Sequence, residues 1–205
     1  MKPNPHVLGV SDPAPGAEAP VVAGFDDAPF RFGDATVPVV GVVMRGATYV
    51  EGVLRTSAEV EGTDATDRIL AAVEATRHRP YLQAVFLDGI AFGGFNVLDP
   101  RRLHERLGIP VVTLARGVPD REGMRAALAA HVPAWEERWR LIEENWPVSM
   151  RTADGVLSYK AHGIGERELG HLLLRTTVRG LIPEPVRVAH MIATALVKGE
   201  SKGRA

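Results

Sequence analysis

Two short apolar stretches of this sequence end in aspartate, and carboxylates placed in this way are typical ligands of a metal ion. Ala84–Leu87 runs directly into Asp88, and Val21–Phe25 runs into Asp26. A short apolar run bounded by a turn predicts a strand buried on both faces, and open α/β sheets bind ligands at the carboxyl ends of such strands. Two carboxylates at that edge repel each other unless a cation lies between them. Aspartate oxygens suit a hard cation, so the pattern predicts a Mg²⁺ or Mn²⁺ site that includes Asp26 and Asp88.

Two further aspartates are candidates for the same site, and each has a second interpretation. Asp64 precedes a helical pattern, where it would act either as a third ligand or only as the N-cap of that helix. Asp27 would either bind the metal or hydrogen-bond the turn that follows it. We assign Asp26, Asp64 and Asp88 to both the catalytic and the metal-binding set, and leave the part of Asp27 open.

Three side chains are candidates for contact with a substrate. Arg116 ends a predicted strand and Arg45 lies in a predicted hairpin turn, and a guanidinium group binds phosphate oxygens well. Asn96 lies in a glycine-rich loop that would form a lip at the carboxyl edge of the sheet, although the same residue would also serve to shape a turn. Arg45, Arg116 and Asn96 are therefore predicted to bind substrate.

The spacing of apolar residues predicts the strands that position these side chains. The five predicted strands cover residues 21–25, 37–44, 48–60, 82–87 and 111–115. The first three form an antiparallel meander, and the last two alternate with helices. Right-handed crossovers then give an α/β fold with a mixed five-stranded sheet of order 3-2-1-4-5, flanked by helices. In this order Asp26 lies next to Asp88, where the strand order reverses direction.

Helical periodicity predicts the remaining elements. The predicted helices begin near Asp64, Pro100, Asp120, Ala134, Glu166 and Pro183. Residues 155–160 are predicted to form a short edge strand, and Gly180 to stand just after the helix that starts at Glu166. The polar side chains of the last helix lie on a narrow stripe, and two of them, Arg187 and His190, are expected to make structural hydrogen bonds to the sheet.

Length and composition favour one soluble domain with a short extension. The chain has 205 residues, 45% of them hydrophobic, and a net charge of −1, which is enough to build a single sizeable core. We expect a flexible N-terminal arm over residues 1–20, rich in proline, alanine and glycine, and a single domain over 21–205. A strand-like piece of the arm ends at Asp12 and competes with Val21–Phe25 for the place of first strand.

Composition also limits the compartment and the partners. The absence of cysteine excludes disulfides and thiolate metal sites and fits the reducing cytoplasm. No apolar run is long enough to span a bilayer, so no membrane partner is expected. A net charge near zero provides no overall attraction for nucleic acid, so a nucleic-acid partner would need a local basic patch. The oligomeric state is left open.

Four segments of the chain resemble endonuclease V, a member of the ribonuclease H-like superfamily. They are Ala23–Asp26, Leu87–Gly89, Pro110–Arg116 and Ile182–His190. The chain is more similar to an uncharacterised endonuclease V-like family, domain of unknown function ninety-nine, which it also resembles at Val42–Gly46, Gly62–Thr66 and Gly94–Asp99. The resemblance covers nearly all of the chain from residue 21. It implies a ribonuclease H-like fold, metal binding by the aspartates, and hydrolysis of phosphodiester bonds in DNA or RNA.

The chain departs from the endonuclease V pattern at four places. Where endonuclease V has a glutamate before the helix that follows the meander, this chain offers Asp64, whose reach is shorter. Arg116 replaces a lysine and cannot donate a proton at neutral pH. Ile164 takes the place of a histidine, and the Tyr-Pro region that wedges into nucleic acid is not visible. Three hypotheses follow: a metal-dependent nuclease, a non-catalytic module that binds nucleic acid or protein, and a phosphohydrolase of small molecules.

Overall fold

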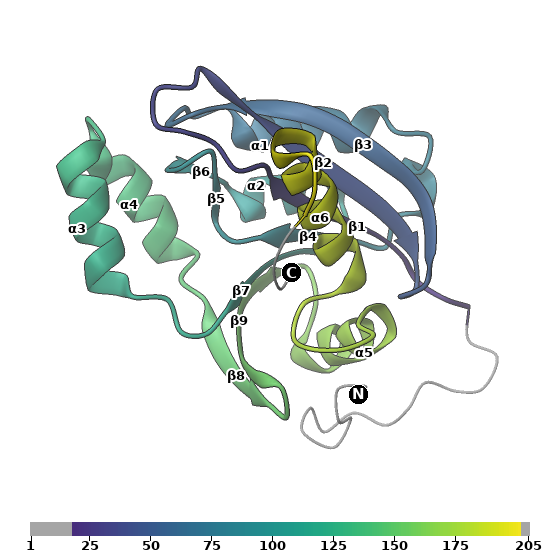
Figure 1. The fold of residues 1–205 in the computed structure, drawn as a ribbon. Helices are drawn as coiled ribbons and strands as arrows, with labels where there is room; N and C mark the ends of the chain where they lie inside the picture. Colours follow the sequence, from purple (N-terminus) through teal and green to yellow (C-terminus); the bar gives the residue numbers. More distant parts are fainter. Residues whose placement is uncertain (1–17, 202–205) are drawn as a thin grey trace.

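A seven-stranded mixed sheet forms the centre of the computed structural model, which describes residues 18–201 (Figure 1). The strands run in the spatial order β3-β2-β1-β4-β7-β9-β8. Their bounds are β1 Val21–Asp27, β2 Thr36–Arg45, β3 Tyr49–Glu59, β4 Ala84–Asp88, β7 Val111–Arg116, β8 Val148–Thr152 and β9 Gly155–His162. The strands β1, β4 and β7 are parallel to one another, and the pairs toward both edges are antiparallel. The three parallel strands therefore end at one common edge.

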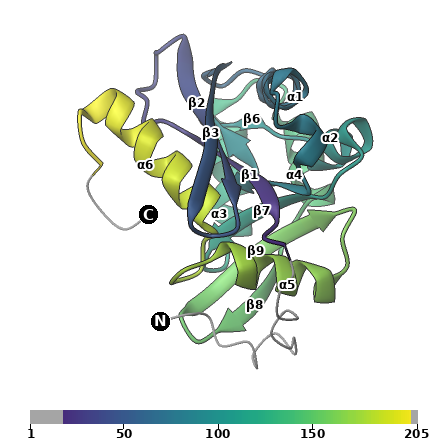
Figure 2. The same cartoon turned by 90° about the vertical axis from the view of Figure 1, so that its right-hand side faces the viewer.

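Helices cover both faces of this sheet. Their bounds are α1 Ala65–Ala75, η2 Arg79–Tyr81, α2 Pro100–Leu107, α3 Arg121–His131, α4 Trp135–Glu144, α5 Glu166–Thr176 and α6 Glu184–Lys198. Figure 2 shows α6 on one side of the sheet and α1 and α2 on the other. The helices α3 and α4 lie together at one end of the molecule (Figure 1). No helix between residues 18 and 201 is long and apolar enough to cross a membrane.

The two faces of β1 pack against different helices because side chains alternate in direction along a strand. Ala23 and Phe25 join the large core cluster to which α1 and α2 contribute, while Val22 faces a second cluster with α5. All three side chains are fully buried. Burial on both faces explains why the sequence of this strand is an unbroken apolar run.

Helix α6 comes into close contact with β1 at Gly24. A Cβ atom at this position would lie 2.4 Å from the backbone nitrogen of Val186 and 2.5 Å from the carbonyl carbon of Pro185. Only glycine therefore lets the first turn of α6 approach the strand this closely. Two residues along a strand and four residues along a helix both advance about 6–7 Å. The contact between Gly24 and Val186 therefore places His190 level with Asp26.

The prediction of five strands was too few, although the first five strands have the predicted order. The strands β9 and β8 extend the sheet beyond β7, so the predicted edge strand over 155–160 is an inner strand and β8 forms the edge. Apolar periodicity missed β8 because the strand is short and lies at the surface, where Val148 is 55% exposed. A two-stranded hairpin, β5 Ala91–Phe92 with β6 Asn96–Val97, occupies the predicted glycine-rich loop.

The C-terminal end of helix α5 differs from the prediction. Helix α5 ends at Thr176 rather than near residue 179, because Thr177 already has an extended backbone. Gly180, with a φ of 73°, therefore belongs to the turn that follows and does not cap the helix.

Most of the predicted arm, with Asp12, lies outside the described residues, so the arm and the single domain over 21–205 stay predictions. The carbonyl of Pro20 accepts a hydrogen bond from the Gly46 N–H at 2.7 Å.

Candidate metal centre

Asp26 and Asp88 lie side by side at the common edge of the parallel strands. Gly24 pairs with Phe86 and Phe25 with Leu87, so continuing the same register brings the two aspartates opposite each other. Both side chains then point to the face of the sheet that α6 covers, because residues two apart share a face. This part of the sequence prediction depended only on two apolar strands in parallel register.

A third polar side chain, His190 of α6, completes the group. One ligand atom from each of Asp26, Asp88 and His190 lies within 4.8 Å of the others. The Nδ1 atom of His190 and the Oδ2 atom of Asp26 are hydrogen-bonded at 2.7 Å, and Oδ1 of Asp26 accepts the Asp27 N–H at 2.8 Å. The side chain of Asp26 is 7% exposed and that of His190 is 39% exposed. The group therefore opens to solvent on the side of the histidine.

Burial and mutual repulsion make this group unusually hard to ionise. Burial, followed by the charges of Asp88 and Asp27, raises the pKa of Asp26 from 3.8 to about 8. Burial also raises the pKa of Asp27 to about 6. The pKa of Asp88 is raised by burial, although Arg116 and His190 oppose that shift. A divalent cation would supply the opposite charge that the carboxylates lack, so two carboxylates and one imidazole fit such an ion.

The raised pKa of Asp26 predicts a pH-dependent stability in the absence of metal. The unfolded chain releases this proton near pH 3.8 and the folded chain only near pH 8. Between these values the folded state binds more protons, so the free energy of unfolding falls as the pH rises. Asp26→Asn removes this titration. At pH 8 in chelator we expect the variant to gain roughly 2 kcal/mol in free energy of unfolding over the wild type, which raises its melting temperature by about 4–8 °C.

Thermal unfolding followed by circular dichroism at both ends of this pH range measures the effect. The melting temperatures of wild type and Asp26→Asn should approach each other as the pH falls to 3.8 and below, where the wild-type carboxyl group becomes protonated in both states. If the wild type has the higher melting temperature at pH 8 in chelator, groups of the protein itself stabilise the buried carboxylate.

Arg116 is the one predicted substrate-binding residue that the structure brings to this edge. It ends β7, two residues after Leu114, which pairs with Asp88. Its guanidinium group is exposed and works to lower the pKa of both Asp26 and Asp88. A phosphate group next to the aspartates can therefore reach this side chain. Its role in substrate binding stays a prediction.

Arg45 lies at the wrong end of the sheet for the predicted substrate contact. It pairs with Val21, the first residue of β1, because β2 runs antiparallel to β1. Asp26 is five residues farther along that strand, a separation of about 17 Å. The guanidinium group of Arg45 makes ion pairs with Glu51 at 2.7 Å and Glu18 at 3.0 Å. The structure therefore does not bring Arg45 to the metal-ligand group, and its substrate contact stays a prediction.

Asp64 and Asn96 form a structural network rather than part of the metal-ligand group. Asp64 stands at the N-cap position of α1 but does not cap it through its side chain. Burial works to raise the pKa of Asp64, yet hydrogen bonds from Arg68, from the Glu59 N–H and from Asn96 outweigh burial and lower the pKa. The Asp64 carboxylate is thus already held by three donors, and the structure does not place it with Asp26, Asp88 and His190.

The structure places Asn96 inside the protein, and its predicted role in substrate binding stays a prediction. Its side chain is fully buried. The amide nitrogen donates to the Glu59 carbonyl at 2.9 Å and to Asp64 at 2.7 Å, and the amide oxygen accepts the Ala65 N–H at 3.0 Å. With every contact directed into the protein, this side chain fixes the start of α1. The alternative interpretation, a residue that shapes the local backbone, agrees with this geometry.

The structure gives Asp27 a contact to the glycine-rich hairpin. Its Oδ2 atom accepts the N–H of Gly93 at 2.8 Å. Gly93 has a φ of 57°, a backbone conformation that favours glycine. The carboxylate therefore ties the end of β1 to the β5–β6 hairpin, rather than to the turn that directly follows Asp27.

His190 is the site residue that sequence reasoning missed. It stands on the polar stripe of a mostly buried helix, and the prediction assigned it a structural hydrogen bond. The sequence signal for a larger role was a histidine on a helix whose other faces are apolar, at the end of the segment Ile182–His190 that resembles endonuclease V. That signal does not say which strand the histidine meets, and Asp26 is 164 residues away along the chain.

Loss of the imidazole should weaken the site without dismantling it. We expect His190→Ala to lower the affinity for Mn²⁺ roughly 10–100-fold, because the variant loses a ligand and the group that orients Asp26. Isothermal titration with Mn²⁺ measures this change, with His131→Ala, at an exposed position of α3, as the matched control. Equal affinities for both variants would reduce His190 to a structural partner of Asp26.

Comparison with protein families decides where this chain belongs. The sequence profile of endonuclease dU matches residues 20–197. The chain is a member of the endonuclease dU family. Related members include the UPF0215 proteins of Methanothermobacter thermautotrophicus and Methanopyrus kandleri. Each is 40% identical to this chain over 90% of its length, and the matches cover 91% and 94% of the respective relatives.

Solved structures place this endonuclease dU family member among the endonuclease V-like proteins. A protein of unknown function from Archaeoglobus fulgidus has a TM-score of 0.79 at 33% identity, with 88% of this chain and 99% of that chain covered. The catalytic domain of human endonuclease V has a TM-score of 0.59 at 15% identity, covering 95% and 93%.

Endonuclease V of Ciona intestinalis, in complex with DNA that contains inosine followed by a ribo-adenosine, has a TM-score of 0.55 at 13% identity, and 90% of each chain is covered. At these identities the two endonuclease V structures share the fold with this chain. The predicted ribonuclease H-like α/β fold and the resemblance to an endonuclease V-like family are thus confirmed.

Proposed function

We propose that this protein is a divalent-metal-dependent endonuclease that hydrolyses phosphodiester bonds in DNA. One observation carries the proposal: Asp26, Asp88 and His190 converge from two strands and a helix within 4.8 Å of one another. Three such groups at a partly open sheet edge have no structural need to meet, and their burial costs stability unless a cation binds. The endonuclease dU family and the endonuclease V fold support the same conclusion.

Each residue of the group has a distinct part in this proposal. Asp26, Asp88 and His190 would hold Mg²⁺ or Mn²⁺, which supplies the positive charge that assists attack on phosphorus and departure of the leaving oxygen. The hydrogen bond between His190 and Asp26 fixes the orientation of the Asp26 carboxyl group. Arg116, exposed at the end of β7, would neutralise charge on the phosphate.

The choice of DNA with a deaminated base comes from the relatives. The family carries the name endonuclease dU, and the Ciona intestinalis structure contains DNA with an inosine. Deoxyuridine and deoxyinosine are the deamination products of deoxycytidine and deoxyadenosine. We therefore infer that a deaminated nucleotide directs the cut, and RNA remains the competing substrate in the test.

Hydrolysis of labelled oligonucleotides tests the proposal. Substrates that carry one deoxyuridine, one deoxyinosine or no modification are offered as single strands, duplexes and RNA, with Mg²⁺, Mn²⁺ or chelator. We expect cleavage that requires metal and favours a modified DNA strand. Asp67→Asn, which alters an exposed carboxylate of α1, is the control that should keep full activity. Cleavage in chelator, or none above the Asp26→Asn background, contradicts the proposal.

The non-catalytic alternative is favoured by the position of Asp64. Because three donors already hold this carboxylate, the described residues bring only three ligand groups together. A protein that binds Mn²⁺ and DNA without cutting any oligonucleotide would support a binding module with the endonuclease V-like fold. Turnover of a phosphomonoester without cleavage of oligonucleotides would instead support the small-molecule phosphohydrolase.

A further inference from the structure

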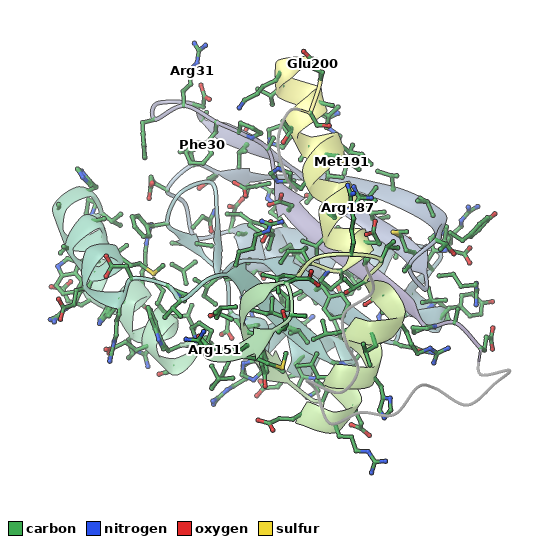
Figure 3. All side chains as sticks on the ribbon, turned by 60° about the horizontal axis from the view of Figure 1, so that its bottom comes forward. Phe30, Arg31, Arg151, Arg187, Met191 and Glu200 are labelled. Atoms are coloured by element: carbon green, nitrogen blue, oxygen red, sulfur yellow. The ribbon has the colours of Figure 1, made fainter. Side chains whose placement is uncertain are left out.

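The loop between β1 and β2, which directly follows the strand that carries Asp26, presents an aromatic side chain to solvent. Phe32 is 83% exposed. It follows Asp27 by five residues, so its backbone lies within about 18 Å of the end of β1. The loop rises above the sheet in Figure 1, and Figure 3 shows Phe30 and Arg31 on it, with Arg31 pointing away from the protein. The loop thus carries Phe32 beside the edge that holds Asp26.

Hydrogen bonds and a ring contact give this loop a defined shape. The Arg31 N–H donates to Oδ2 of Asp34 at 2.8 Å, and the Asp34 N–H donates to the Arg31 carbonyl at 3.0 Å. Phe30 packs against the core, and the Phe32 ring meets it edge-on, with centroids 5.9 Å apart and an interplanar angle of 78°. Phe30 therefore supports the Phe32 ring from below, and one face of that ring is left to solvent.

The exposed position of Phe32 gives little of the stabilisation that burial provides. A phenylalanine buried in a core contributes about 1.5–3 kcal/mol. A single exposed apolar side chain is ordinary on a protein surface. Here, however, the side chain is supported by a second ring, flanked by Arg31 and carried by the loop that directly follows the strand of Asp26. An aromatic face with an adjacent cation is the combination with which proteins hold single-stranded nucleic acid, by stacking on a base and contacting the phosphate.

We propose that Phe32 stacks on an unpaired base of the substrate, next to the phosphodiester bond held at Asp26, Asp88 and His190. This proposal rests on the proposed nuclease function and adds a substrate class to it: DNA that is single-stranded or locally unpaired at the cut. Bases inside a duplex already stack on each other and leave no face free, so only an unstacked base can lie on Phe32. Arg31 contacts the phosphate of that nucleotide.

Binding of a labelled single-stranded oligonucleotide, measured by fluorescence anisotropy, tests this inference. All variants carry Asp88→Asn so that cleavage cannot interfere. We expect Phe32→Ala to weaken binding roughly 5- to 150-fold, the range of one base–aromatic stacking contact, and Phe32→Trp to restore it. Tyr81→Ala is the matched control, because Tyr81 is also exposed, at 66%, but lies before β4, at the opposite end from Asp88. It should bind like the parent.

Two results would overturn the stacking role. One is equal binding by Phe32→Ala and the parent protein, or no binding of single strands by either. The other is loss of Mn²⁺ affinity in Phe32→Ala with Asp88 intact, because the loop would then support the metal group. Weaker binding in Phe32→Ala beside a wild type that cleaves no oligonucleotide keeps the stacking role and contradicts only the nuclease.

Discussion

Asp88→Asn should lower the affinity for Mn²⁺ about 100-fold or more, a loss of about 2.8 kcal/mol or more in binding free energy, and abolish metal-dependent cleavage. Asp88 faces Asp26 across two parallel strands, and its charge is one of the reasons why the pKa of Asp26 is raised. An amide has nearly the same shape but no charge. The variant therefore loses attraction for a cation while the strand that carries it stays in place.

The control for this experiment is another Asp→Asn change at the same sheet edge. Asp64→Asn keeps the metal group intact, so its Mn²⁺ affinity should stay within about threefold of the wild type. This corresponds to a change of less than about 0.7 kcal/mol in binding free energy. Its melting temperature should fall, since the ion pair with Arg68 at 2.8 Å is lost. Isothermal titration at neutral pH compares both variants. If Asp64→Asn loses as much affinity as Asp88→Asn, Asp64 moves into the group when metal binds.

Sequence reasoning located the two aspartates because their positions depend on local patterns. Each ends an apolar run, and the crossover rule fixes two parallel strands as neighbours. Arg45 was misplaced for a related reason: a hairpin turn at the end of β2 lies at the start of β1, and the prediction did not follow the antiparallel direction through to that end. The order of these strands was correct, and the distance of Arg45 from Asp26 comes from their direction.

The rest of the site depends on packing that no local pattern records. His190 reaches Asp26 only because α6 crosses β1 at one particular height, which the close contact at Gly24 sets. Asn96 is buried because the hairpin β5–β6 folds back against the start of α1, where it bonds Ala65. In the sequence alone, Asn96 had the same features as a loop residue at a substrate lip.

Gly24→Ala should test this packing directly, with a large loss of stability. The new Cβ atom would lie 2.4 Å and 2.5 Å from backbone atoms of Val186 and Pro185. Backbone cannot rotate away as a flexible side chain can, so β1 or α6 must shift. Overpacking of this kind costs about 3 kcal/mol, which in a chain of this size lowers the melting temperature by about 6–12 °C. Gly165→Ala is the control, because its nearest neighbouring atom is 4.0 Å away.

The Mn²⁺ affinity of the Gly24→Ala variant shows whether α6 or β1 moves to accommodate the new Cβ atom. If α6 moves away from β1, His190 loses its contact with Asp26, and the Mn²⁺ affinity of folded Gly24→Ala should fall as it does in His190→Ala. If β1 bends instead, the strand carries Asp26 away from Asp88 as well, and the loss should approach that of Asp88→Asn. A destabilised variant with wild-type Mn²⁺ affinity would contradict both and show that the contact at Gly24 does not position the metal group.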